Sequence, residues 1–123
     1  MDDDHPYIDD PVQVYLAEVC KVPPLSRDEE ISCVQHIRAG DQQAESAERL
    51  LVEANLGLVV SIAERYRNEH IHILDLIQVG NDGLVRALQT FKGSGEDSFS
   101  AYAAVHIERA IAEAVASSNS TGA

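Results

Sequence analysis

Apolar residues recur at intervals of three and four along most of this chain, which is the spacing of one face of an α-helix. No segment alternates apolar and polar residues in the way that a half-buried strand does. Each helix in such a pattern must bury its apolar stripe against another helix. The sequence therefore predicts an all-α fold, a compact bundle of about five helices.

Proline, glycine and capping residues set the expected ends of these helices. Ser26-Arg-Asp-Glu29 reads as a capping box, and Gly40 is a typical helix stop. The expected helices run from Asp10-Pro11 to Pro23-Pro24, from Ser26 to Gly40, from about Gln42 to Arg67, from about Leu74 to Phe91, and from Ser98 or Ser100 to the residue before Ser117. Gly80 and Gly83 each cost the fourth helix about 1 kcal/mol relative to alanine, which indicates that they permit close helix packing.

The third expected helix is the longest continuous pattern. Its buried stripe is predicted to hold Leu50, Leu51, Ala54, Leu58, Ile62 and Tyr66. The short connection 68–72 separates it from the fourth helix, and residues 92–97 form a loop before the fifth. We expect one domain over residues 10–117, with an acidic disordered tail over 1–9 and a flexible tail over 118–123.

Acidic residues outnumber basic ones by 21 to 9, which gives a net charge of −12. A chain of this charge repels a bare nucleic-acid duplex at long range, because binding to phosphates depends on lysine and arginine. A basic protein surface is a better match. No run of about 18 apolar residues is present, and the N-terminus carries aspartates where a secretory signal carries bases, so we expect a cytoplasmic protein and no membrane partner.

The chain contains no recognisable catalytic or cofactor-binding motif. It lacks a nucleophile elbow, a phosphate-binding glycine loop and a zinc-protease helix. His70 and His72 could supply two metal ligands, but a polar loop is the simpler interpretation. Cys20 and Cys33 fit small buried hydrophobic positions. We therefore expect no enzyme, no metal and no cofactor.

Four motifs, in order, resemble one family. The run Asp75-Leu-Ile-Gln-Val-Gly-Asn-Asp-Gly-Leu84 resembles the D-L-I-Q-E-G-N-x-G-L run in region 2 of the sigma-70 family of bacterial RNA polymerase sigma factors. Residues 53–66 resemble the E-A-N-L-R-L-V-x-x-I-A-x-x-Y stretch of that family, and residues 10–18 resemble its D-P-V-R-x-Y-L-x-E opening of region 1.2. Residues 99–111 resemble its F-S-T-Y-A melting helix.

The resemblance implies a partner and a docking surface. In the family, the fourth-helix motif docks on the coiled coil of the largest subunit of core RNA polymerase. Carried over position by position, the polymerase-binding residues are Asp75, Gln78, Asn81 and Val85. Val79 and Asp82 replace the residues usual in this motif, and a basic docking surface on the polymerase would suit the acidity of this chain.

The resemblance also implies contact with the −10 element of promoter DNA, where flipped bases stack on aromatic side chains. The expected DNA-binding residues are Asn55, Phe91 and Tyr102, together with Arg109, the one basic residue in 93–123. Ala101, Val105, His106 and Glu108 replace a threonine, two tryptophans and an arginine of the family pattern. The family also has lysine or arginine at four positions that are not basic in this chain: Gln13, Ala17, Gly57 and Glu64. Each lost stacking aromatic costs about 1–3 kcal/mol, so −10 recognition is expected to be weakened.

Three interpretations stay open. The first is a transcription initiation module that binds core RNA polymerase and recognises −10 DNA weakly, completed by a second sigma subunit. The second is a regulator that does not bind DNA and that occupies the sigma site or binds an anti-sigma factor. The third is an acidic interaction module with no role at the polymerase.

Overall fold

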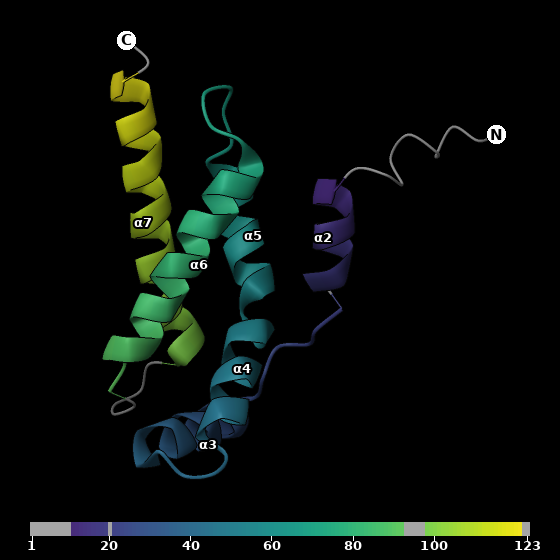
Figure 1. Cartoon of the computed structure of the whole chain (residues 1–123), viewed down its shortest axis with the longest axis vertical. Coiled ribbons are helices and arrows are strands. Elements are labelled where there is room, and N and C mark those ends of the chain that lie inside the picture. Colours follow the sequence, from purple (N-terminus) through teal and green to yellow (C-terminus); the bar gives the residue numbers. More distant parts are fainter. Residues whose placement is uncertain (1–10, 20, 93–97, 122–123) are drawn as a thin grey trace, which may run out of the picture.

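The computed structural model describes residues 11–19, 21–92 and 98–121, apart from the side chains at 11, 12 and 119–121. These residues form helices and no strand, which confirms the predicted all-α class. The helices are α2 (Pro11–Val19), α3 (Arg27–Ala39), α4 (Ala44–Ala54), α5 (Leu56–Arg65), α6 (Ile73–Thr90) and α7 (Phe99–Thr121). Helices α6 and α7 lie side by side, α5 follows α4 along the middle of the molecule, and α3 packs on α4 at its lower end (Figure 1).

The predicted capping signals are confirmed on α3. The Ser26 hydroxyl oxygen accepts a hydrogen bond from the Glu29 amide at 3.1 Å, and the Glu29 carboxylate accepts one from the Ser26 amide at 2.8 Å. Gly40 ends the helix with φ of 61°, a left-handed conformation that glycine adopts without steric cost. Buried Cys33 lies on this helix, and its burial raises the pKa of its thiol, in keeping with a packing role.

The prediction of one helix over 42–67 is wrong, because the helix is interrupted at Asn55. The Asn55 side-chain amide donates to the Leu51 carbonyl at 2.8 Å, which is the oxygen that a continuing helix would give to the Asn55 backbone amide. That backbone amide bonds to the Val52 carbonyl instead, at 3.0 Å. A side-chain group thus competes with the helical ladder and separates α4 from α5.

The burial of α4 also differs from the expectation. Leu50 was expected in the buried stripe, but it is 45% exposed, whereas Leu51 is fully buried. Ala47 and Leu51, one turn apart, face the interior, and Leu50 lies about 100° around the helix from Leu51. Because α4 is covered mainly by α3, only one narrow stripe of it is buried.

The structure agrees with the expected start of α7 but differs from its expected end. Ser98 accepts a hydrogen bond from the Ala101 amide at 3.0 Å and so caps the helix, as one of the two predicted alternatives. At the other end α7 continues to Thr121, so the expected tail over 118–123 is helical as far as that residue. Helix α2 ends at Val19, before the predicted stop at Pro23-Pro24, whereas α6 begins and ends within a residue of its prediction. The expected tail over 1–9 and the loop residues 93–97 lie outside the described residues.

Two glycines determine how closely α6 approaches its neighbours. A Cβ atom on Gly80 would lie 2.7 Å from Val59 Cγ1, and one on Gly83 would lie 2.7 Å from the backbone oxygen of His106. Neither position has room for alanine without movement of a neighbour, so the predicted packing role is confirmed. The largest fully buried side chains are Phe99, Leu51, Ile62, Leu76, Leu84, Ile107, Ile111 and Val59.

Candidate functional site

The four expected polymerase-binding residues share one side of α6, and we call this set the α6 ridge: Asp75, Gln78, Asn81 and Val85. Their spacing of three, three and four places them along one helix face. Asp75 and Gln78 are exposed, and Val85 is 43% exposed. The other side of the helix is fixed in the core by Leu76, Ile77 and Leu84.

The ridge is not uniform. Asn81 is half-buried, and its Oδ1 atom is buried without a hydrogen-bond partner among the described residues. A partner that docks on the ridge therefore meets only part of this amide. At the start of α6, His72 Nδ1 accepts a hydrogen bond from the Leu74 amide at 3.0 Å, so this histidine caps the helix. In the described ranges, no three potential metal ligands are grouped.

Four rings form a second feature, which we call the aromatic row: Phe99, Phe91, Tyr102 and His106. The ring centroids of Phe91 and Tyr102 are 5.1 Å apart, and those of Tyr102 and His106 are 4.7 Å apart. Phe99 is buried and packs edge-on against Phe91 at 5.4 Å. The Tyr102 hydroxyl lies 2.7 Å from the Thr90 hydroxyl, which links α7 to the end of α6. Two expected base-contacting residues, Phe91 and Tyr102, are therefore brought together.

Asn55 lies in a buried polar network instead of the aromatic row. It is 4% exposed, and its Oδ1 atom lies 2.9 Å from the Ser100 hydroxyl, two residues before Tyr102. The same hydroxyl lies 2.8 Å from a carboxylate oxygen of Glu30, and the other oxygen of Glu30 accepts from the Phe99 amide at 3.0 Å. The network joins α3, the α4–α5 break and the start of α7.

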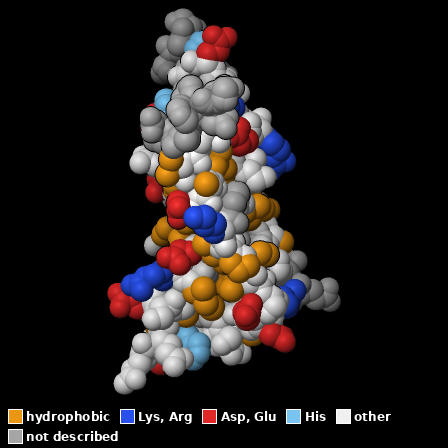
Figure 2. Space-filling view, turned by 90° about the vertical axis from the view of Figure 1, so that its right-hand side faces the viewer, with side chains coloured by type: hydrophobic (Ala, Val, Ile, Leu, Met, Phe, Trp, Pro, Cys, Tyr) orange, Lys and Arg blue, Asp and Glu red, His pale blue; other side chains and the backbone are white. Residues whose placement is uncertain are grey.

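Asn55 and Ser100 also line a cavity of about 390 Å³ whose other walls come from α2, the segment after it, the end of α4 and α5. The apolar lining residues are Val19, Val22, Pro24, Ala54 and Leu58. Hydrophobic side chains reach the surface over the lower half of the α2 side of the molecule, between scattered acidic and basic groups (Figure 2). This combination of an apolar wall and a buried amide suits a flat ligand with hydrogen-bonding edges.

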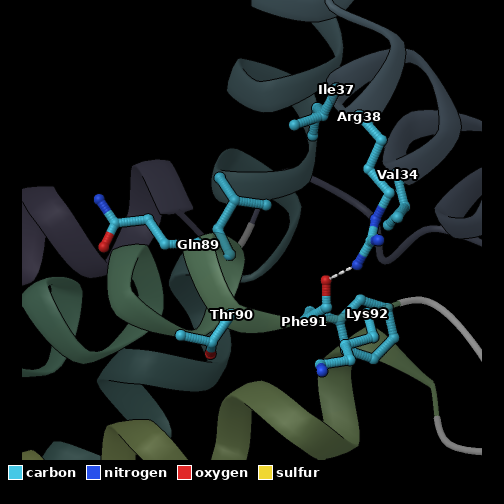
Figure 3. A pocket seen from close by; sticks show the side chains of 8 residues that line it. Val34, Ile37, Arg38, Gln89, Thr90, Phe91 and Lys92 are labelled. Atoms are coloured by element: carbon cyan, nitrogen blue, oxygen red, sulfur yellow. Dashed lines mark hydrogen bonds between the residues drawn. The ribbon is translucent and has the colours of Figure 1, made fainter.

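Several contributors were missed by sequence reasoning. Arg38 donates from Nη2 to the Phe91 carbonyl and so ties the end of α3 to the end of α6, beside a cavity of about 500 Å³ (Figure 3). Nothing in the sequence connects these residues, which are 53 positions apart. Glu30 gave a weak signal, since it is an acid on the apolar side of its helix, next to Cys33 and Val34.

Glu108 is a site where the resemblance expects an arginine, and the structure gives it a partner. The Tyr66 hydroxyl donates to the Glu108 carboxylate at 2.7 Å. This hydrogen bond, followed by desolvation, raises the pKa of Tyr66 above its usual value. Arg109, the fourth expected DNA-binding residue, is exposed on α7 and lines a smaller cavity between α6 and α7.

Among the described residues, no helix is both long and apolar enough to cross a membrane.

The sequence matches two known family profiles. The profile of sigma-70 region 2 matches residues 51–121, and that of sigma-70 factor region 1.2 matches residues 10–43. The chain is 48% identical over 109 residues to the RNA polymerase sigma factor SigA of Lactococcus lactis subsp. cremoris, and 50% identical over the same length to SigA of Clostridium acetobutylicum.

SigA of Listeria monocytogenes is 47% identical over 109 residues. Each match covers 89% of this chain but only 28–30% of the relative, so the chain spans less than a third of the curated relatives that it matches. The region 2 profile alone covers more than half of the chain. By these matches, and with a helical fold that fits them, the chain belongs to the sigma-70 family.

Proposed function

We propose that this chain is a transcription initiation module that docks on core RNA polymerase through the α6 ridge and contacts −10 promoter DNA weakly. The observation that carries the proposal is the α6 ridge itself. An exposed carboxylate, an exposed amide and an exposed valine share one side of a helix whose other side is held by glycine contacts and buried leucines.

Charge supports a polymerase partner over free DNA. The chain carries a net charge of −12, and Asp75 on the ridge has no ion pair among the described residues. A basic coiled coil on the largest subunit of the polymerase would gain both steering and specificity from this surface. The relatives named above are described as RNA polymerase sigma factors, which supports the same partner for this chain.

The nucleotide-facing side supports weak recognition. Phe91 and Tyr102 provide two rings for stacking, and Asn55 and Ser100 line a second recess. Val105 is 54% exposed at a position where the resemblance expects tryptophan. A missing aromatic ring removes about 1–3 kcal/mol per stacked base, which is a large part of the roughly 4–10 kcal/mol that separates specific from non-specific binding.

The test is retention on immobilised core RNA polymerase. Substitution of Asp75→Arg together with Gln78→Ala is expected to reduce affinity at least about tenfold, which corresponds to about 1.4 kcal/mol. The matched control is Glu45→Arg with Gln42→Ala, because these exposed residues also pair a carboxylate with an amide three positions apart, outside the ridge. Equal retention of the ridge variant and the control would reject docking through the ridge.

A second candidate is favoured by the same exposed Val105 and by Glu108. In this alternative the chain is a regulator that does not bind DNA and that occupies the sigma site or binds an anti-sigma factor. Transcription in vitro separates the two functions. Promoter-dependent initiation when this chain is added to core enzyme, alone or with a second sigma subunit, supports the initiation module, whereas inhibition supports the regulator.

A further inference from the structure

The cavity of about 500 Å³ drawn in Figure 3 lies where the end of α3 meets the end of α6. Its volume falls within the range of about 300–1,000 Å³ that is usual for small-molecule sites. Of the residues that were expected to bind polymerase or DNA, Phe91 alone lines it. The cavity is therefore a feature apart from the α6 ridge and from most of the aromatic row.

Half of the lining is apolar and is incompletely covered by the rest of the chain. Four of the eight lining residues are apolar: Val34, Ile37, Leu88 and Phe91. Val34 is buried, whereas the other three are only half-buried, although they pack against the core. Part of their apolar surface is therefore left in contact with water, and a ligand with an apolar body would remove it from water.

The charged side chains of the lining are both basic. Arg38 and Lys92 line the cavity, and none of the eight lining residues is acidic. This is a local exception in a chain whose acidic residues outnumber its basic ones by 21 to 9. Acids on other parts of the surface act through water, where physiological salt screens charges beyond about 8 Å. The lining therefore favours an anion over a cation.

Arg38 is held in place at this cavity, which sets it apart from an arginine that moves freely at the surface. Its Nη2 atom donates to the Phe91 carbonyl, so the side chain reaches from α3 to the end of α6 (Figure 3). A guanidinium carries five N–H donors, so this single bond leaves others for a ligand. Because the side chain is already ordered, a ligand that binds it loses less free energy to ordering.

We propose that this cavity binds a small carboxylic acid with an aliphatic or aromatic body. The carboxylate accepts hydrogen bonds from the Arg38 guanidinium and is attracted by Lys92, and the body covers Ile37 and Leu88. Inorganic phosphate has no apolar part to cover these side chains, and a nucleic-acid strand is repelled more strongly by the net charge of −12. A protein partner would need a patch of about 800 Å², much larger than this recess.

The experiment is a titration of the full chain, labelled with ¹⁵N, with octanoate as the probe. Octanoate is expected to shift the amide signals of Ile37, Leu88 and Phe91 along a saturable curve. Octanol lacks the charge and acetate lacks the chain, so each is expected to bind at least about tenfold more weakly. The absence of a saturable shift at these amides, or equal binding of octanol or acetate, would overturn the proposal.

Two variants of the lining and one control test the charges. Arg38→Gln is expected to weaken octanoate binding at least about tenfold. Lys92→Gln is expected to weaken it about threefold, and it leaves the bond between α3 and α6 in place, so the test does not depend on the folding of the Arg38 variant. Arg49→Gln removes an exposed charge on α4, outside the lining, and is expected to keep the wild-type affinity. Wild-type affinity in both variants of the lining would contradict the assignment.

Other anions are titrated in parallel under the same conditions. Inorganic phosphate and a single-stranded oligonucleotide are both expected to leave the amide signals of Ile37 and Leu88 near their starting positions. If phosphate moved these signals at lower concentration than octanoate, the cavity would be a general anion site. If the oligonucleotide did so, the cavity would be a nucleic-acid site, and either result would overturn the proposal.

Discussion

The α6 ridge and the aromatic row lie on neighbouring helices, yet they are built in different ways. Three of the four ridge side chains are exposed on a regular helix, and Asn81 is half-buried. The aromatic row is a set of interlocked rings, and Arg38, Thr90 and the Glu30 network hold it from three sides. Single substitutions in the α6 ridge are therefore expected to change what it binds. A change in the binding properties of the aromatic row requires changes in the residues that support the rings as well.

The largest expected effect concerns the close contact between α6 and α7, the two helices on which the surfaces lie. Gly83→Ala places a methyl group 2.7 Å from the His106 backbone oxygen, and this backbone atom cannot move aside easily. We expect a loss of about 1–3 kcal/mol in the free energy of unfolding, measured by urea denaturation. Gly57→Ala is the control, since nothing lies within 4 Å of its added methyl group, and it is expected to be neutral or stabilising. A neutral Gly83→Ala variant would contradict the close approach of α6 and α7.

The second prediction tests the support of the aromatic row alone. Glu30→Ala removes the acceptor of the Phe99 amide and of the Ser100 hydroxyl, and leaves buried groups unpaired. The expected loss is about 2 kcal/mol in the free energy of unfolding, with weaker binding of −10 DNA and unchanged polymerase retention of the folded protein. The exposed Glu45→Ala is the matched control. If Glu30→Ala lowered polymerase retention as strongly as DNA binding, the two surfaces would not be separable.

The third prediction strengthens one surface without touching the other. Val105→Trp adds a ring to the exposed face of α7 and is expected to improve binding of a −10 oligonucleotide by about 1 kcal/mol. Val14→Trp adds the same ring at a position of similar exposure on α2, and no gain is expected there. Fluorescence anisotropy with the polymerase complex measures both variants. An equal gain at the two positions would show non-specific stacking.

The smallest expected effect is a pH dependence. The pKa of Tyr66 is raised in the folded chain by its hydrogen bond to Glu108. The stabilisation from this pair is therefore fully present below the unfolded pKa of about 10 and is lost as the pH rises through the higher folded value. Glu108→Gln is expected to return the alkaline titration of Tyr66, followed by tyrosinate absorbance, toward its ordinary range. An unchanged titration would mean that the pair does not form in solution.

Local signals in the sequence accounted for much of the fold. The capping box at Ser26, the stop at Gly40 and the packing glycines of α6 act within a few residues or through a missing side chain, so their roles are visible in the sequence. The break at Asn55 was not visible, because it depends on a side-chain amide that takes the Leu51 carbonyl and meets Ser100 from a distant helix.

The candidate site follows the same division. Phe91 and Tyr102 were expected together and meet, since the resemblance carries the order of helices that brings them into contact. Arg38 and Glu30 contact residues 53 and 69 positions away, and no periodicity predicts such pairs. Their supporting roles depend on where α3 lies, which is a property of the assembled bundle.

The 18 residues of α6 form one uninterrupted helix, about 27 Å long. Val85 closes the ridge, and Phe91 follows it six residues later, about 9 Å further along the axis. The ridge and Phe91 are therefore joined by helical backbone without a break. The spacing between the ridge and the ring of Phe91 is set by one continuous stretch of helical backbone, so the distance from a partner bound on the ridge to that ring is fixed by the length of α6.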